Sequence, residues 1–168
     1  MTFAAIILGL VTLQRVGELL LAQRNTERLL AAGAHEVAPE HYGLLVGLHG
    51  AWLLALWLWG HDQPISAGWL IVFVGLQTAR VWVIATLGPR WTTRIIVMPG
   101  APLVTTGPYR FLAHPNYAVV AGEIAALPLA LNLPVIALAF SVLNAAILCI
   151  RIRSENRALS RTPSSWVR

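Results

Sequence analysis

Five long apolar stretches, separated by polar segments, dominate the hydropathy pattern of the chain. They cover residues 3–22, 42–60, 66–87, 116–131 and 134–150. A helix needs about 20 apolar residues to cross the hydrocarbon core of a bilayer, so the last two stretches are short for a span. The pattern predicts an all-α integral membrane helical bundle of about five transmembrane helices, the last two of which form a C-terminal helical hairpin.

The composition supports this class of protein. Hydrophobic residues make up 57% of the 168 residues and charged residues only 11%, a balance that is typical of integral membrane proteins. No Gly/Ser linker, low-complexity tract or block of charge divides the sequence, so we expect a single domain over residues 1–168. The lone Cys149 lies in an apolar stretch, which indicates packing rather than a disulfide or a metal site.

The basic residues indicate the orientation of the bundle. The chain has no lysine, and the arginines outside the apolar stretches all fall on one side of a five-span bundle: Arg24, Arg28, Arg90, Arg94, Arg110, Arg151, Arg153, Arg157, Arg161 and Arg168. The positive-inside rule makes this side cytoplasmic, so we expect the N-terminus outside and the C-terminus in the cytoplasm. Because topology accounts for the net charge of +5, no nucleic-acid partner is expected.

Charged residues also occur inside the apolar stretches. Arg15 and Glu18 are three residues apart, which places them on one face of the first helix. Arg80 lies in the third stretch and Glu123 in the fourth. A charge in the membrane core costs about 2.5–3.5 kcal/mol on insertion scales, so such residues usually face inward and pair. For these residues a structural ion pair and a ligand contact are both open, and Arg80 pairs with Glu123 only if the two lie at the same depth.

A polar segment rich in proline and glycine, residues 88–114, joins the third stretch to the fourth. Its composition excludes a long regular helix and predicts a structured cap at the membrane surface. The end of this segment belongs to the run GPYRFLAHPNY, residues 107–117. In this run His114 occupies an N-cap position and Pro115 the first position of a helix. The free amides of such a helix start attract a carboxylate or phosphate, with His114, Asn116 and Tyr117 as neighbouring donors. A plain helix cap fits the same residues equally well.

A second polar pair follows the predicted hairpin, on a predicted short tail helix. Arg151 and Glu155 are four residues apart, so both lie on one face of a helix that leaves the membrane. Alone, they would be an ordinary solvated ion pair. The hairpin, however, returns them to the side of the membrane on which GPYRFLAHPNY lies, and this favours a common site.

The motifs G-P-Y, H-P-N-Y and R-x-x-x-E, with two apolar helices before the last, resemble the isoprenylcysteine carboxyl methyltransferase (ICMT) family, in particular its small bacterial members. The run from Gln14 to Asn25, with Arg15 and Glu18, is similar to the same bacterial branch. The resemblance implies an enzyme of the bacterial inner (cytoplasmic) membrane. Such an enzyme binds S-adenosyl-L-methionine on the cytosolic side and takes a small lipophilic acceptor from the bilayer.

The resemblance also carries residue roles over to this sequence. It assigns catalysis to Arg151 and Glu155, and cofactor binding to Tyr109, His114, Pro115, Asn116, Tyr117 and Glu155. Two positions depart from the family pattern. Ala113 stands where many relatives have an arginine, and Asn156 where many have a second glutamate, so a cationic contact is missing and the acid chemistry of the tail falls to Glu155 alone.

Three classes of function fit these residues. The leading one is an O-methyltransferase that converts S-adenosyl-L-methionine to S-adenosylhomocysteine and methylates a carboxylate or a hydroxyl, such as a polyketide-type enol, on a lipophilic acceptor. An NADPH-dependent membrane reductase of the sterol-reductase-like type, which shares a similar hairpin, and a non-catalytic membrane scaffold are the alternatives. The sequence has no dinucleotide-binding or metal-ligand motif, so no metal is expected.

Overall fold

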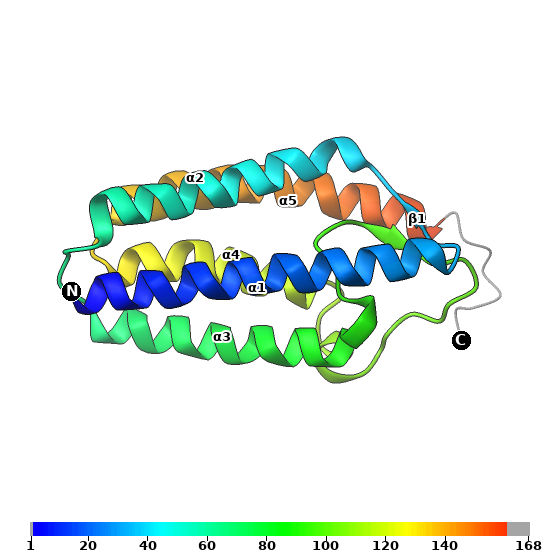
Figure 1. Cartoon of the computed structure of the whole chain (residues 1–168), viewed down its shortest axis with the longest axis horizontal. Helices are drawn as coiled ribbons and strands as arrows, with labels where there is room; N and C mark the ends of the chain where they lie inside the picture. Colours follow the sequence, from blue (N-terminus) through cyan, green and yellow to red (C-terminus); the bar gives the residue numbers. More distant parts are fainter. Residues whose placement is uncertain (1, 161–168) are drawn as a thin grey trace.

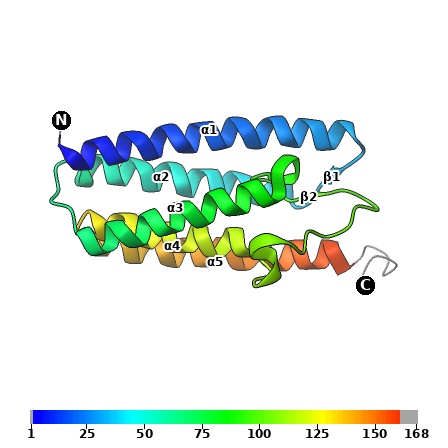
Figure 2. The same cartoon turned by 90° about the horizontal axis from the view of Figure 1, so that it is seen from below.

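The computed structural model describes residues 2–160, with side chains up to residue 157. Five helices make up the bundle: α1 (Phe3–Ala31), α2 (Tyr42–Gly60), α3 (Ala67–Leu87), α4 (Pro115–Ala130) and α5 (Pro134–Ser160). They lie side by side along the long axis, and the N-terminus is at the opposite end from the polar cap (Figures 1 and 2). The predicted all-α membrane bundle is confirmed.

The helix bounds follow the hydropathy pattern inside the bundle and extend beyond it at one end. Helix α2 has the bounds expected from the sequence, whereas α1 continues from residue 22 to Ala31 and α5 from residue 150 to Ser160. These extensions are polar but rich in Arg, Glu, Leu and Ala, which are good helix formers, so the helices continue past the apolar residues. The C-terminal tail is thus the end of α5 and not a separate helix.

Four of the helices are long and apolar enough to cross a membrane: α1, α2, α3 and α5. Helix α4 has only 16 residues, which corresponds to a length of about 24 Å. It packs chiefly against α3 and α5, and Trp52 of α2 donates a hydrogen bond to the Ile124 carbonyl of α4 at 3.3 Å. Helix α4 therefore contacts α2, α3 and α5, whereas α1 packs mainly on α2.

The larger of two apolar core clusters lies at the end of the bundle near the N-terminus. Leu8, Trp52, Leu56, Ile124 and Leu127 are fully buried there and come from α1, α2 and α4. Large apolar side chains are exposed along the outer faces of the helices, which suits a surface in contact with lipid.

The segment between α3 and α4 forms the cap that its composition predicts. It contains two short 3-10 helices, η2 (Gly88–Arg90) and η3 (Gly107–Arg110), and the strand β2 (Ile96–Val97). Strand β2 pairs antiparallel with β1 (His35–Glu36), which follows α1, and a third 3-10 helix, η1 (Pro39–His41), leads into α2. This pairing was not predicted, because two-residue strands leave no pattern in a sequence.

One glycine fixes the cap against the bundle. Gly107 has φ +57°, and a Cβ at this position would lie only 2.5 Å from the Thr86 hydroxyl of α3. A residue with a side chain would be strained by both the backbone conformation and the collision. Gly107 thus lets η3, with Tyr109, lie directly on the end of α3.

Candidate active site

The hairpin of α4 and α5 brings the two polar motifs of the sequence together. The Tyr117 hydroxyl, in the first turn of α4, donates a hydrogen bond of 2.8 Å to Glu155 Oε2 on α5. His114 Nδ1 lies 3.7 Å from the same carboxylate oxygen, and the His114 ring stacks on the Tyr117 ring with centroids 5.5 Å apart. Residues almost forty positions apart in the sequence therefore form one cluster.

His114 precedes α4 as expected, but its side chain does not cap the helix. It occupies the N-cap position before Pro115 and makes no capping hydrogen bond. Its Nε2 atom instead lies 3.2 Å from Asn156 Oδ1 on α5. The imidazole thus bridges α4 to two consecutive residues of α5, and Asn156 has a structural role of its own.

Arg151 lies beneath this cluster and is almost fully buried, with 4% of its surface exposed. It donates a hydrogen bond of 2.9 Å to the Thr93 carbonyl of the cap, and its guanidinium lies 5.9 Å from the centre of the Tyr117 ring. Its Nε atom is buried and has no hydrogen-bond partner within the described chain. Arg151 and Glu155 share a face of α5 as predicted, and both contact Tyr117, one at the ring and the other at the hydroxyl.

Tyr109 and Asn116 complete the neighbourhood. Tyr109 packs beside the buried Trp91 and Val119, and burial together with the charge of Glu155 raises the pKa of its hydroxyl to about 12. A phenol with this pKa is neutral at physiological pH and serves as a hydrogen-bond donor. Asn116 Oδ1 is buried and unpartnered among residues 2–157. Tyr109 and the residues of the two motifs thus lie at one end of the bundle.

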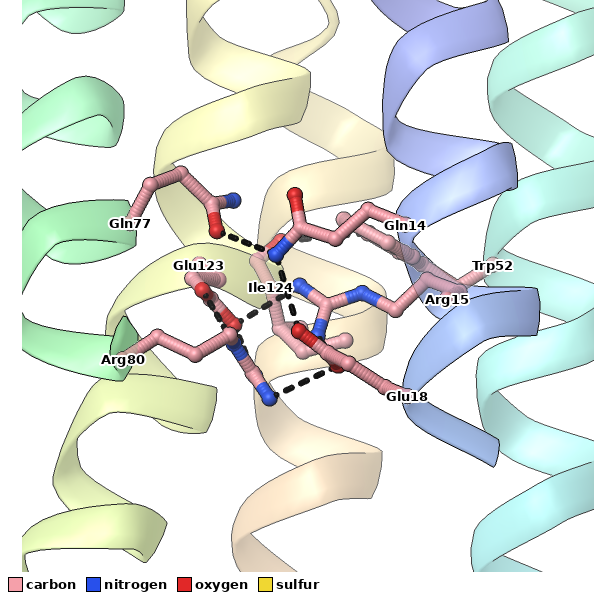
Figure 3. Close-up of polar contacts among 8 residues, drawn as sticks. All are labelled: Gln14, Arg15, Glu18, Trp52, Gln77, Arg80, Glu123 and Ile124. Carbon is pink, nitrogen blue, oxygen red and sulfur yellow. Dashed lines mark hydrogen bonds and ion pairs between the residues drawn. The ribbon is translucent and has the colours of Figure 1, made fainter. Parts of the chain in front are cut away.

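A second polar cluster, which we call the charge layer, lies deeper in the bundle (Figure 3). It consists of Gln14, Arg15 and Glu18 of α1, Gln77 and Arg80 of α3, and Glu123 of α4. Arg80 Nε donates to Glu123 Oε1 at 2.7 Å, and its terminal nitrogens contact Glu123 Oε2 and, at 3.1 Å, Glu18 Oε2. Arg15 bonds Glu18 at 2.7 Å and Glu123 at 2.9 Å.

The charge layer answers the question that the sequence left open. Arg80 and Glu123 do lie at the same depth and pair, and Arg15 and Glu18 join them in a network of two cations and two anions. Gln14 extends the network with bonds of 2.8 Å to Glu18 and Gln77. Gln77 was missed at the sequence level, although its position three residues before Arg80 on α3 was a signal for it.

Comparison with known proteins identifies the family. The model of the isoprenylcysteine carboxyl methyltransferase (ICMT) family matches residues 69–161, which include most of α3, the cap and the α4–α5 hairpin. The chain belongs to the ICMT family. Membership indicates a membrane methyltransferase in general terms. The matched range covers every residue of the cluster around Glu155 and excludes α1 and α2.

Two relatives extend the similarity to the whole chain. An uncharacterized protein of Bacillus subtilis (strain 168), YpbQ, is 37% identical over 160 residues, which cover 92% of this chain and 95% of that protein. An uncharacterized protein of Haemophilus influenzae is 25% identical over 166 residues, which cover 95% of this chain and 96% of that protein. No solved structure matches the chain. The ICMT family thus provides the function class, and these relatives add no substrate.

Proposed function

We propose that this ICMT family member is an S-adenosylmethionine-dependent methyltransferase that methylates a carboxylate or hydroxyl oxygen of a small lipophilic acceptor. The observation that carries the proposal is the hydrogen bond between Tyr117 and Glu155, with His114 beside it. This contact joins the two motifs that the family resemblance assigns to the cofactor, and it lies at the end of the bundle where the helices meet the polar cap.

The residues of the cluster fit the chemistry of S-adenosylmethionine. The carboxylate of Glu155 can accept hydrogen bonds from ribose hydroxyls or from an ammonium group, and Tyr109 is a neutral donor. Asn116 Oδ1 and Arg151 Nε are buried atoms that have no partner among the described residues, so both are available to a ligand. We assign cofactor binding to Tyr109, His114, Pro115, Asn116, Tyr117 and Glu155.

The cofactor, when bound, supplies a methyl group that its sulfonium charge already activates. The protein then has to orient the acceptor oxygen and exclude water. Arg151 can hold an anionic oxygen by charge-assisted hydrogen bonds, which suffices for a carboxylate acceptor. A hydroxyl acceptor must also lose its proton, and Glu155, the carboxylate nearest to Arg151 on α5, is the group that can take it.

The same end of the bundle is proposed to face the cytoplasm of a bacterial cell. The cap and the C-terminal part of α5 lie at this end, away from the N-terminus (Figure 1). They carry Arg90, Arg94, Arg110, Arg151 and Arg153. Arg161 and Arg168, which support the same orientation, fall outside the described residues. With the N-terminus outside, the cluster faces the compartment in which S-adenosylmethionine is made.

Calorimetric binding of S-adenosylhomocysteine to the purified protein in detergent tests the proposal, with NADPH as the comparison ligand. Wild-type protein should bind the former alone. His114→Ala and Glu155→Ala should each weaken binding by more than about tenfold, because each removes a polar group from the cluster. Arg153→Ala, an exposed neighbour on α5, is the matched control and should bind normally. Binding of NADPH, or normal binding by both cluster variants, would contradict the assignment.

A further inference from the structure

Helix α5 carries a second set of buried polar atoms between the cluster and the middle of the bundle. Ser141 and Asn144 lie on the same face of α5 as Arg151, because the three residues are spaced by three and seven positions. Helix α5 packs on α4 and α2, so this face is turned toward those helices. Asn144 is 1% exposed, and α5 places it about 10 Å along the helix axis from Arg151.

Asn144 is unusual because neither polar atom of its side chain has a partner. Both Oδ1 and Nδ2 are buried, and neither makes a hydrogen bond to any residue that the structure describes. The hydroxyl of Ser141, one turn away, is buried and unpartnered in the same way. A buried amide without hydrogen bonds opposes folding, so a pair of such residues on one face calls for a binding partner.

Asn25 shows what a structural asparagine looks like in the same protein. It is 3% exposed, and its Nδ2 donates to the Trp91 carbonyl at 2.8 Å and to the Gly88 carbonyl at 3.3 Å. It thereby ties α1 to the cap. Asn144 has the same burial and the same side chain but no such bonds.

The charges nearby limit what Asn144 can bind. Arg15 and Arg80, the two cations of the charge layer, are already paired with Glu18 and Glu123. An anion buried at this depth would find no free cation and would be strongly disfavoured. An amide, by contrast, offers one donor group and one acceptor to a neutral polar group.

We propose that Asn144 and Ser141 form a subsite for the lipophilic acceptor, and that they hydrogen-bond a neutral group of it, such as a carbonyl, hydroxyl or amide. This inference rests on the proposed methyltransferase function. The acceptor oxygen that receives the methyl group lies beside Arg151, and the second polar group lies deeper, toward Asn144. The enzyme therefore selects acceptors that carry a neutral polar group between the reactive oxygen and the hydrocarbon chain.

The first test compares the two asparagines by the same substitution. Leucine has nearly the shape of asparagine without its polar atoms. Asn144→Leu should raise the melting temperature of the free protein by about 2–4 °C, because it removes an unpaired buried amide. Asn25→Leu should lower it by at least as much, because it breaks two bonds. A fall in melting temperature for Asn144→Leu would show a structural role and overturn the proposal.

The second test measures acceptor selection with two matched pairs of amphiphiles. N-decanoyl-γ-aminobutyrate and pentadecanoate present a carboxylate with and without an amide. Octyl para-hydroxybenzoate and para-decylphenol present a hydroxyl with and without a carbonyl. With labelled S-adenosylmethionine, wild-type protein should show a KM roughly three- to tenfold lower for the member that has the neutral group, in at least one pair.

The Asn144→Leu variant should lose this preference, because its KM for the member with the neutral group should rise while its KM for the plain member should not rise. Ser141→Ala should show a smaller loss of the same kind. Equal KM values within each pair for wild-type protein, an unchanged preference in Asn144→Leu, or no methylation of any of the four probes would each overturn the subsite. Binding of S-adenosylhomocysteine by the same preparations separates this outcome from a failure of the methyltransferase proposal, which would remove that binding as well.

Discussion

Two polar regions lie inside this membrane bundle, and they differ in how far the protein itself satisfies them. In the charge layer, Glu18 and Glu123 each contact both Arg15 and Arg80. Along α5 and at the start of α4, buried atoms of Asn116, Ser141, Asn144 and Arg151 lack partners among residues 2–157. The first region joins α1, α3 and α4 by ion pairs, and we propose that the second binds molecules that are not part of the chain.

The contrast has a physical basis in the membrane setting. Breaking a buried ion pair costs about 3–5 kcal/mol, so charges that serve structure are expected to be paired by the protein. The charge layer balances two cations with two anions, although Arg15 Nε and Gln77 Nε2 remain unpartnered within the described chain. A binding region has to leave polar atoms without partners for its ligand. The ligand-free protein is less stable as a result, because these atoms are buried without hydrogen bonds.

The largest expected effect comes from opening the charge layer. Glu123→Leu leaves Arg15 and Arg80 with Glu18 as their remaining carboxylate, so the free energy of unfolding in detergent should fall by about 3–5 kcal/mol. The double variant Glu123→Leu with Arg80→Leu should recover part of this loss, since it removes one unpaired cation. Glu27→Leu, at an exposed position of α1, is the control. A loss below about 1 kcal/mol for Glu123→Leu would mean that the layer does not hold the helices.

The next effect separates binding from stability. Tyr117→Phe removes the hydrogen bond to Glu155 but keeps the ring that packs on His114 and Arg151. Affinity for S-adenosylhomocysteine, measured by calorimetry, should fall roughly three- to tenfold, because the Glu155 carboxylate loses its donor. The melting temperature should change little. A large loss of stability with normal affinity would place Tyr117 among the structural residues instead.

A smaller effect is expected where a charged pair lies near water. Arg94 bonds Glu36 at 2.9 Å, and its guanidinium lies 4.3 Å from the centre of the Tyr42 ring. The Arg94 side chain is 38% exposed, so solvent screens the pair, and Arg94→Ala should cost no more than about 1 kcal/mol in an unfolding titration. A cost equal to that of Glu123→Leu would remove the distinction between the charge layer and an ordinary surface pair.

The last effect appears only at high pH. The pKa of Tyr109 is raised to about 12, so the folded state keeps the phenol protonated after an unfolded chain, with a tyrosine pKa of about 10, would have lost the proton. This contribution to stability is complete below about pH 10 and disappears as the pH rises through about 12. The stability of Tyr109→Phe should therefore decline less steeply over that window than that of the wild type. Parallel curves would show that Tyr109 is solvated like a free tyrosine.

The sequence alone predicted the class of fold, the bounds of α2, the hairpin and the start of α4 at Pro115. Hydropathy carries this information because the membrane fixes the length of apolar segments. It does not reveal where α1 and α5 end, because their polar ends are also good helix formers. The sequence also did not indicate the β1–β2 pairing, because two-residue strands leave no pattern in a sequence.

The candidate site was only partly predictable. Short motifs pointed to His114, Tyr117, Arg151 and Glu155, and the hairpin placed them on one side of the membrane. The rotation of each helix about its axis is set by packing, so the sequence did not indicate that Arg15, Arg80 and Glu123 meet, or that His114 turns to α5 instead of capping α4. Asn144 gave no signal, because one asparagine in an apolar run forms no pattern.

The most direct test of the central claim is the melting temperature of the protein in detergent with and without saturating S-adenosylhomocysteine. A ligand at about 100 times its Kd stabilises the folded state by about 2.7 kcal/mol, so the wild type should melt about 5–10 °C higher when it is bound. Glu123→Leu should start lower and rise similarly, whereas Glu155→Gln should start near the wild type and rise by no more than about half as much, since a tenfold loss of affinity leaves about 1.4 kcal/mol of stabilisation. No rise in the wild type, or an equal rise in Glu155→Gln, would contradict the division between a structural and a binding region.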